Sequence, residues 1–464
     1  MNKVVPIAWV VLAATVSAQE PEPVSYSADV LPILTAHCLG CHQPAKAKGD
    51  IVLARHADLF VENEDHGPLV IAGDPGASTL IEVLTGADGE PPAMPEDADP
   101  LPAHEIELLR KWIAQGAKDD TASAASDAVS PEHPPTYLLP PVVGALAFSP
   151  DGKLIAVAGD HEVLLHRDDG KSLVARLVGL SERIESLAFS SDGSRLAVVG
   201  GSPGRFGEVQ IWDVAKRSLI QSKLVTGDCL FGVSWSPDGK LLAFGATDTA
   251  MRAIDIASGK QVLYQSAHED WVLDTVFSTD GSHLVSVSRD RSMKLVLVKE
   301  EQFIDNITSI TPGVLRGGLI SVDRHPTKDE LLIGGADGQP KLFRMYREKK
   351  RKIGDNYNRL RVFEKMPGRV FAVEFRADGK QMVAASSHRA GGVVRVCDVE
   401  NGKTLWTREM SGGIYTAGYR PDGAVIGAAG FGGMVYLLDA KTGKTLKEFL
   451  PVPIASASTP QEQR

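Results

Sequence analysis

The chain has 464 residues, of which 43% are hydrophobic and 23% are charged. This balance is typical of a folded protein with a substantial core and excludes a disordered chain. The formal net charge of −10 argues against a general nucleic-acid-binding protein, because such proteins are normally basic. Four cysteines in this length exclude a scaffold built from disulfides.

The first residues read as a targeting segment. Lys3 precedes a mainly apolar run, and small residues lead up to Ala18. We therefore expect residues 1–18 to be a signal peptide and the mature protein to be periplasmic or secreted. The run is shorter than the roughly 20 apolar residues that a membrane-spanning helix needs, so we expect no membrane span in the mature chain. An uncleaved N-terminal anchor is the alternative.

Composition divides the rest of the chain. Between residues 19 and 120 there are 19 acidic and 6 basic residues, a charge that serves solubility or steers a basic partner. A stretch rich in Ala, Ser, Asp and Pro follows and is typical of a linker. We predict four segments after the signal peptide: a first domain over 19–118, a linker over 119–138, a second domain over 139–455 and a disordered tail over 456–464.

The first domain contains the sequence Cys38-Leu39-Gly40-Cys41-His42. C-x-x-C-H is the attachment sequence of c-type haem, in which each thiol adds to one vinyl group and the histidine binds the iron. A thioredoxin-type redox pair or half a zinc site is the alternative. The signal peptide, the adjacent His42 and the absence of a second cysteine pair nearby favour one covalent haem c on Cys38 and Cys41.

Met94 is the candidate for the second axial ligand of the iron. It is the one methionine between residues 19 and 118, and the prolines around it stiffen its loop. A methionine packed in an ordinary loop is the alternative. Four histidines compete for the same role: His37, His56, His66 and His104.

Three helices are expected to surround this site. The first covers 28–36 and leads to the cysteines, and the second begins at the 73–75 turn with Asp74 as its cap. The third starts near Leu101, places apolar residues on one face and ends at Gly116. The sequence therefore predicts a small all-α domain.

Residues 26–118 resemble the planctomycete-type cytochrome c domain. The resemblance rests on VLPILTAHCLGCH, KAKGDIVL, AGDPGASTLI, the methionine loop and LPAHEIELLRKWIAQGA, in that order. It implies that Cys38 and Cys41 hold the haem and that His42 and Met94 are its axial ligands. The family often has Met-Pro-Pro where this chain has Met94-Pro95-Glu96.

The second domain repeats a short turn sequence, first seen as FSPDG at 148–152. Glycine tolerates the positive φ that such a turn requires, and short apolar runs flank each copy. A period of 41 to 51 residues with several short strands per unit predicts an all-β propeller, and seven markers predict seven blades. The markers are Asp151, Asp192, Asp238, Asp280, Thr327, Asp378 and Asp422.

These repeats resemble the WD40 family from about residue 140 to residue 451. The eponymous dipeptide is intact only at Trp212-Asp213, and one repeat keeps His268 and Asp290 at a spacing suited to a hydrogen bond. The resemblance implies a propeller that binds a protein partner on one of its faces. A basic insertion, REKKRK at 347–352, is either a docking site for an acidic group or a solvated hairpin. Cys229 and Cys397 are expected to be free and buried.

The two domains together predict an exported electron carrier whose propeller positions the haem beside a redox partner protein. We expect no catalytic residues and an electron carrier rather than a substrate-converting enzyme, because two axial ligands close the iron. A haem enzyme resembling cytochrome cd1 reductases is one alternative, although those propellers have eight blades and hold a second haem. A haem-based redox or gas sensor is the other alternative.

Overall fold

The computed structural model describes most of the chain. Contacts divide it into two units, one made of Met1–Leu34 and His56–Ser123 and the other of Thr35–Arg55 and Ala124–Arg464. The predicted signal peptide and tail lie outside the described residues, and the predicted domain borders stay predictions. The described ranges are 23–43, 46–63, 67–86, 91–96, 98–120, 129–308, 316–352, 356–389 and 391–455.

All described helices lie before residue 120. None of them is long and apolar enough to cross a membrane. Two pairs of very short strands accompany them, which the all-α prediction missed. The elements are a π-helix η1 (Tyr26–Val30), α1 (Leu31–His37), the 3-10 helices η2 (Lys48–Asp50) and η3 (His56–Phe60), α2 (Thr79–Thr85), α3 (Ala103–Ala114), β1 (His42–Gln43) with β2 (Lys46–Ala47), and β3 (Glu62–Asn63) with β4 (Gly67–Pro68).

Helix α3 confirms the third predicted helix. Leu109, Trp112 and Ile113 share one face at helical spacing and are fully buried. Gly116, at φ +95°, follows the helix, where this backbone conformation is easy only for glycine. The indole nitrogen of Trp112 donates to the carbonyl oxygen of Lys118 at 3.0 Å, which fixes the chain after the helix.

The predicted start of α2 was wrong. The helix begins at Thr79 after Ser78, not at the 73–75 turn. The Asp74 carboxylate accepts hydrogen bonds from the backbone N–H groups of Gly76 and Ala77, at 3.0 and 3.1 Å. These bonds close a separate turn, so Asp74 does not cap the helix.

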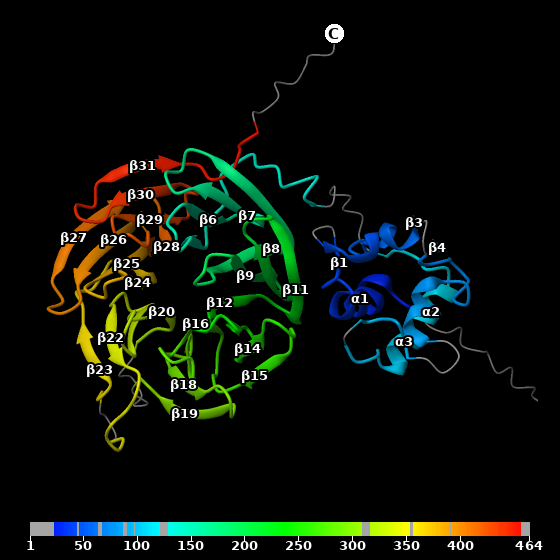
Figure 1. Cartoon of the computed structure of the whole chain (residues 1–464), viewed down its shortest axis with the longest axis horizontal. Coiled ribbons are helices and arrows are strands. Elements are labelled where there is room, and N and C mark those ends of the chain that lie inside the picture. Colours follow the sequence, from blue (N-terminus) through cyan, green and yellow to red (C-terminus); the bar gives the residue numbers. More distant parts are fainter. Residues whose placement is uncertain are drawn as a thin grey trace, which may run out of the picture. The chain divides into compact units, whose positions relative to one another are not determined.

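The remainder of the chain folds as a β-propeller. Six antiparallel sheets follow one another around a ring, and each takes its strands in chain order (Figure 1). The first sheet has seven strands: β5 (Leu146–Phe148), β6 (Leu154–Ala158), β7 (Asp160–Arg167), β8 (Leu173–Phe189), β9 (Arg195–Ser202), β10 (Phe206–Asp213) and β11 (Ser218–Thr226).

Each of the other five sheets has four strands. Buried apolar residues from neighbouring sheets pack together, so the core is divided into layers between sheets. The strands are β12 (Leu230–Trp235), β13 (Leu241–Ala246), β14 (Met251–Asp255), β15 (Gln261–Gln265); β16 (Val272–Phe277), β17 (His283–Ser288), β18 (Met293–Leu297), β19 (Gln302–Asn306); β20 (Leu319–Arg324), β21 (Glu330–Gly335), β22 (Lys341–Arg344), β23 (Arg359–Val362); β24 (Arg369–Phe375), β25 (Gln381–His388), β26 (Gly391–Asp398), β27 (Thr404–Met410); β28 (Ile414–Tyr419), β29 (Val425–Gly430), β30 (Val435–Asp439) and β31 (Thr445–Phe449).

Strand β8 is unusually long because it serves two neighbours. Its first part, 173–178, pairs with β7, and its last part, 183–189, pairs with β9. This continuous strand joins what would otherwise be two four-stranded sheets. The sequence predicted seven blades, whereas the structure has six sheets of four to seven strands. The seven-stranded sheet accounts for the difference.

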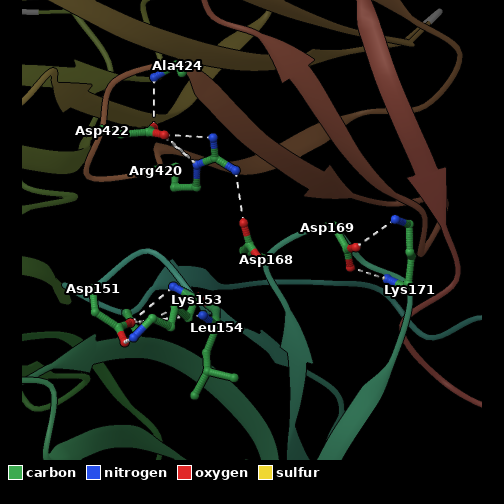
Figure 2. Close-up of polar contacts among 10 residues, drawn as sticks. Asp151, Lys153, Leu154, Asp168, Asp169, Lys171, Arg420, Asp422 and Ala424 are labelled. Atoms are coloured by element: carbon green, nitrogen blue, oxygen red, sulfur yellow. Dashed lines mark hydrogen bonds and ion pairs between the residues drawn. The ribbon is translucent and has the colours of Figure 1, made fainter.

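The Asp-Gly turns have the predicted conformation. Gly152 has φ +70°, and the Asp151 carboxylate accepts hydrogen bonds from the Ser149 hydroxyl at 2.7 Å and the Lys153 N–H at 3.0 Å (Figure 2). These hydrogen bonds hold the turn through residues of the turn itself. The same serine–aspartate bond recurs at Ser190 with Asp192, Ser236 with Asp238 and Ser278 with Asp280.

An arginine takes the serine position in the last turn and closes the ring. Arg420, after β28, donates to Asp422 of its own turn and, at 3.0 Å, to Asp168 after β7 (Figure 2). Backbone closure accompanies it, since the Val143 N–H donates to the Gly430 carbonyl at 3.1 Å. The first and last sheets are thus held together by both side chains and backbone.

We expect the Arg420–Asp168 pair to stabilise this closure measurably. A double-mutant cycle with Arg420→Met and Asp168→Asn should give a coupling of about 0.5–1.5 kcal/mol in urea unfolding, because both side chains are largely shielded. The exposed Lys171–Asp169 pair is the matched control, and its coupling should be clearly smaller because solvent screens it. Equal couplings in the two cycles would contradict this role for Arg420.

The predicted hydrogen bond between His268 and Asp290 is confirmed. His268 Nδ1 lies 2.8 Å from the Asp290 carboxylate, and its Nε2 lies 2.7 Å from the Ser286 hydroxyl. Burial acts to raise the pKa of Asp290, yet the hydrogen bond and charge of His268 hold that pKa below its usual range. These residues form a buried polar network between the loop before β16 and the turn after β17.

The basic insertion is partly committed to the propeller itself. Arg347 and Arg351 lie 3.5 and 2.6 Å from the Asp305 carboxylate of β19. Lys349 and Lys350 remain exposed. The insertion is therefore neither a free docking surface nor a wholly solvated hairpin, since two of its cations tie it to the neighbouring sheet.

Candidate functional site

The backbone of the Cys38–His42 segment forms a tight turn directly after α1. The N–H groups of Cys41 and His42 donate to the Cys38 carbonyl at 3.1 and 3.0 Å. On the other side, the Leu53 N–H donates to the His42 carbonyl at 2.9 Å, and β1 pairs with β2. The structure therefore brings Cys38, Cys41 and His42 together on one turn that is fixed at both ends.

His42 is oriented by a backbone carbonyl. Its Nδ1 lies 3.3 Å from the carbonyl oxygen of Ile51. A histidine that donates from Nδ1 to a carbonyl binds a metal through Nε2, and this hydrogen bond is the usual support of a metal-binding imidazole. The contact therefore fits the predicted role of His42 as an iron ligand. Sequence reasoning missed Ile51, because a carbonyl partner leaves no mark on residue type.

Cys38 and Cys41 are half-buried residues on this turn. Burial, and then the neighbouring Cys41, raise the pKa of the Cys38 thiol to about 12, so it carries its proton at neutral pH. Addition of a neutral thiol to a vinyl group places the sulfur on one carbon and the hydrogen on the other, so no further reactant is needed. Neither Cys38 nor Cys41 forms a disulfide, which the predicted attachment requires.

Met94 lies in the segment 91–96, which is attached to helix α2. Its N–H donates to the carbonyl oxygen of Val83 at 3.0 Å, and its side chain is partly exposed. Met94 belongs to the first contact unit, whereas Cys38, Cys41 and His42 belong to the second. The pairing of Met94 with His42 across one iron therefore stays a prediction.

His56 is used by the packing of the first unit. Its Nε2 lies 2.8 Å from the Ala117 carbonyl oxygen, and its ring packs edge-on against Tyr26 and Trp112, with centroids 4.8 and 5.8 Å away. These contacts assign His56 to the core of this unit and weaken it as a competing ligand. Of the other three histidines, His37 and His104 are exposed and His66 lies outside the described residues.

Comparison with known families supports a fusion of two kinds of domain. Residues 38–97 match the family model described as Planctomycete cytochrome C, a range that includes all four predicted haem residues. Residues 139–166 match the model for the WD domain, G-beta repeat. Residues 205–315 match the WD40 domain of anaphase-promoting complex subunit 4. The β-propeller in the second part of the chain is thus similar to WD-repeat domains.

Similar proteins share the repeats over part of their length. The chain is 28% identical over 150 residues to transcription factor unc-37 of Caenorhabditis elegans, covering 32% of this chain and 24% of that protein. It is 29% identical over 150 residues to WD repeat-containing protein VIP3 of Arabidopsis thaliana, covering 29% and 46%. It is 26% identical over 163 residues to eukaryotic translation initiation factor 3 subunit I of Aspergillus terreus, covering 33% and 47%. The chain spans less than half the length of these curated relatives.

Proposed function

We propose that this chain is an exported electron-transfer protein with one covalently bound haem c and a propeller that binds partner proteins. Cys38 and Cys41 would hold the haem through thioethers, and His42 and Met94 would be its axial ligands. A haem closed by histidine and methionine exchanges single electrons and has a raised reduction potential. The propeller would bring a redox partner protein to it.

One observation carries the haem assignment. The carbonyl of Ile51 accepts from His42 Nδ1, which is the support that a metal-binding imidazole needs. The match of 38–97 to a cytochrome c family supports the same reading. In this scheme, the turn fixes the two thiols, Ile51 sets the tautomer of His42, and the 91–96 loop supplies the thioether of Met94.

The seven-stranded sheet is best counted as two blades that share β8, which gives seven blades in all. Two of the repeat markers, Asp151 and Asp192, lie in this sheet, whereas every four-stranded sheet contains one marker. The separate pairing of 173–178 and 183–189 supports this count. A propeller of this size offers two broad faces for protein partners, as WD repeats commonly do.

Absorption spectra under carbon monoxide test the axial ligands. We expect the reduced wild-type protein, made in a host with c-type haem maturation, to ignore carbon monoxide because both axial positions are filled. Met94→Ala should open one position and bind the gas, while His104→Gln should behave as wild type.

The results distinguish the electron carrier from the haem enzyme and the gas sensor. Free binding of carbon monoxide by the wild-type protein would favour the haem enzyme or the gas sensor instead. A closed iron in Met94→Ala would assign the second ligand to a histidine. Export is tested separately, by N-terminal sequencing of the mature protein from the periplasmic or secreted fraction, where a start at Gln19 is expected.

A further inference from the structure

A cavity of about 900 Å³ lies within the ring of the propeller. The innermost strands line it, and the pairing register of most of them shifts where they reach the cavity. Such shifts are β-bulges, which turn the side chain of the extra residue away from the sheet. In five strands that skipped residue itself lines the cavity: Glu185, Leu273, Ile320, Phe371 and Tyr415.

Four of these five bulge residues make an apolar wall. Leu273 and Ile320 are aliphatic, and the rings of Phe371 and Tyr415 lie 4.9 Å apart at an angle of 55°. They come from four successive sheets, β16 to β28, so one side of the cavity is apolar and aromatic. Such a wall suits the aliphatic part of a ligand or the flat face of a cation.

Glu185 is the one charged residue among the five. It comes from β8 of the seven-stranded sheet and not from the four sheets that form the apolar wall. Its carboxylate has no hydrogen-bond or ion-pair partner among the described residues. Burial raises the pKa of Glu185, and the positive charge of Arg183 partly opposes this. A partly buried carboxylate without a partner is costly, and a cation placed beside it would remove that cost.

The remaining charges of the lining favour a cation as well. Asp160, Glu182 and Asp274 line the cavity together with Glu185, and Arg183 is the one cation of the lining. Glu182 also pairs with Arg205 at 3.4 Å, which leaves Asp160 and Glu185 as the main source of negative charge. Asp274 already accepts from two backbone N–H groups, and burial raises its pKa to about 7, so it offers no free acceptor and only part of a negative charge at neutral pH. The cavity thus combines an excess of negative charge with an apolar wall, which matches a cation on an apolar stem.

We propose that this axial cavity receives an arginine or lysine side chain from a partner polypeptide. The cationic group would pair with Glu185, and its methylene stem would lie along Leu273 and Ile320. This inference rests on the proposed role of the propeller as an interaction platform and is independent of the haem. The partner segment would be an exposed loop or terminus with a basic residue.

Calorimetry with two blocked peptides tests the cavity on the full-length, haem-loaded protein in 0.15 M salt. One peptide is alanine-rich with a central arginine, and the other has glutamine in its place. We expect the wild-type protein to bind the arginine peptide about tenfold more tightly, a preference that Glu185→Gln removes. Glu300→Gln makes the same change of charge in the exposed turn after β18 and should keep the preference.

Ile320→Lys provides a second variant, because an amine inside the cavity should pair with Glu185 and exclude the peptide. Thermal unfolding checks that each variant is folded. Equal binding by Glu185→Gln and Glu300→Gln would overturn the proposal, and so would unchanged binding by Ile320→Lys. A wild-type protein without preference for arginine would overturn the cavity assignment alone, since the outer surfaces of the propeller could still bind a partner.

Discussion

Replacing both cysteines of the attachment turn, as Cys38→Ala and Cys41→Ala, is expected to abolish covalent haem completely. Each thioether requires a thiol, and the side chain of alanine cannot add to a vinyl group. The protein would be produced in a host with c-type haem maturation. The measurements are haem staining on a denaturing gel and the mass of the intact chain.

The chain supplies its own matched control for this experiment. Cys229 and Cys397 are free and buried, with exposures of 3% and 0%, as the sequence predicted. Burial raises the pKa of the Cys229 thiol to about 11. Cys229→Ala with Cys397→Ala removes as many thiols but should keep full haem loading. Loss of haem in this control, or its retention in the first variant, would refute the assignment to Cys38 and Cys41.

The propeller was predictable because the same turn sequence recurs in most of its repeats. In four of the turns a serine, an aspartate and a glycine suffice, as at Ser149, Asp151 and Gly152, and no distant contact is needed. The pair of His268 and Asp290 was predictable for a similar reason, since His268 lies just before β16 and Asp290 lies in the turn between β17 and β18 of the same repeat. The continuity of β8 was not, because a strand that serves two neighbours has no distinct pattern.

The candidate site divides in the same way. Cys38, Cys41 and His42 lie on one local turn, so their spacing alone predicts that they meet. Met94 lies 52 residues after His42, and residue spacing cannot place a distant loop over an iron. The cavity residue Glu185 could not be predicted from the sequence either, because the bulge that turns it inward depends on the pairing of β8 with β9.

Buried carboxyls that join neighbouring sheets should make the propeller less stable as the pH rises. The Glu374 carboxylate of β24 accepts from the Tyr419 N–H of β28 at 2.6 Å. Asp323 of β20 accepts in the same manner from the Phe375 N–H of β24 at 2.7 Å. Each side chain therefore connects the inner strand of one sheet to that of the next.

The direction follows from the pKa of Glu374 in the two states. Burial, and then the charge of Asp323, raise this pKa to about 8 in the folded protein, against about 4.3 in an unfolded chain. Between these values the folded state holds a proton that the unfolded state has lost. Stability is therefore fully present below about pH 4 and falls as the pH rises through 8, by at most about 1.4 kcal/mol per pH unit for one proton. Burial also raises the pKa of Asp323, to about 6, which adds to the fall.

Glu374→Gln should remove part of this pH dependence without breaking the connection between the sheets. Its amide oxygen can still accept from the Tyr419 N–H, so the free energy of unfolding at pH 5 should match that of wild type within about 0.5 kcal/mol. At pH 9 the variant should be more stable by roughly 1–3 kcal/mol, because no charge has to be buried. Urea unfolding of the propeller at both pH values measures the difference.

A turn carboxyl provides the control, because its titration lies outside this range. The hydrogen bond from the Ser278 hydroxyl is the main cause that lowers the pKa of Asp280 to about 2. Asp280→Asn should therefore shift the stability equally at pH 5 and pH 9, whereas Glu374→Gln should not. If the two variants show the same constant offset, Glu374 is ionised in the folded propeller at both pH values. The junction between β24 and β28 would then tolerate a full negative charge, and the pH dependence would have to come from elsewhere.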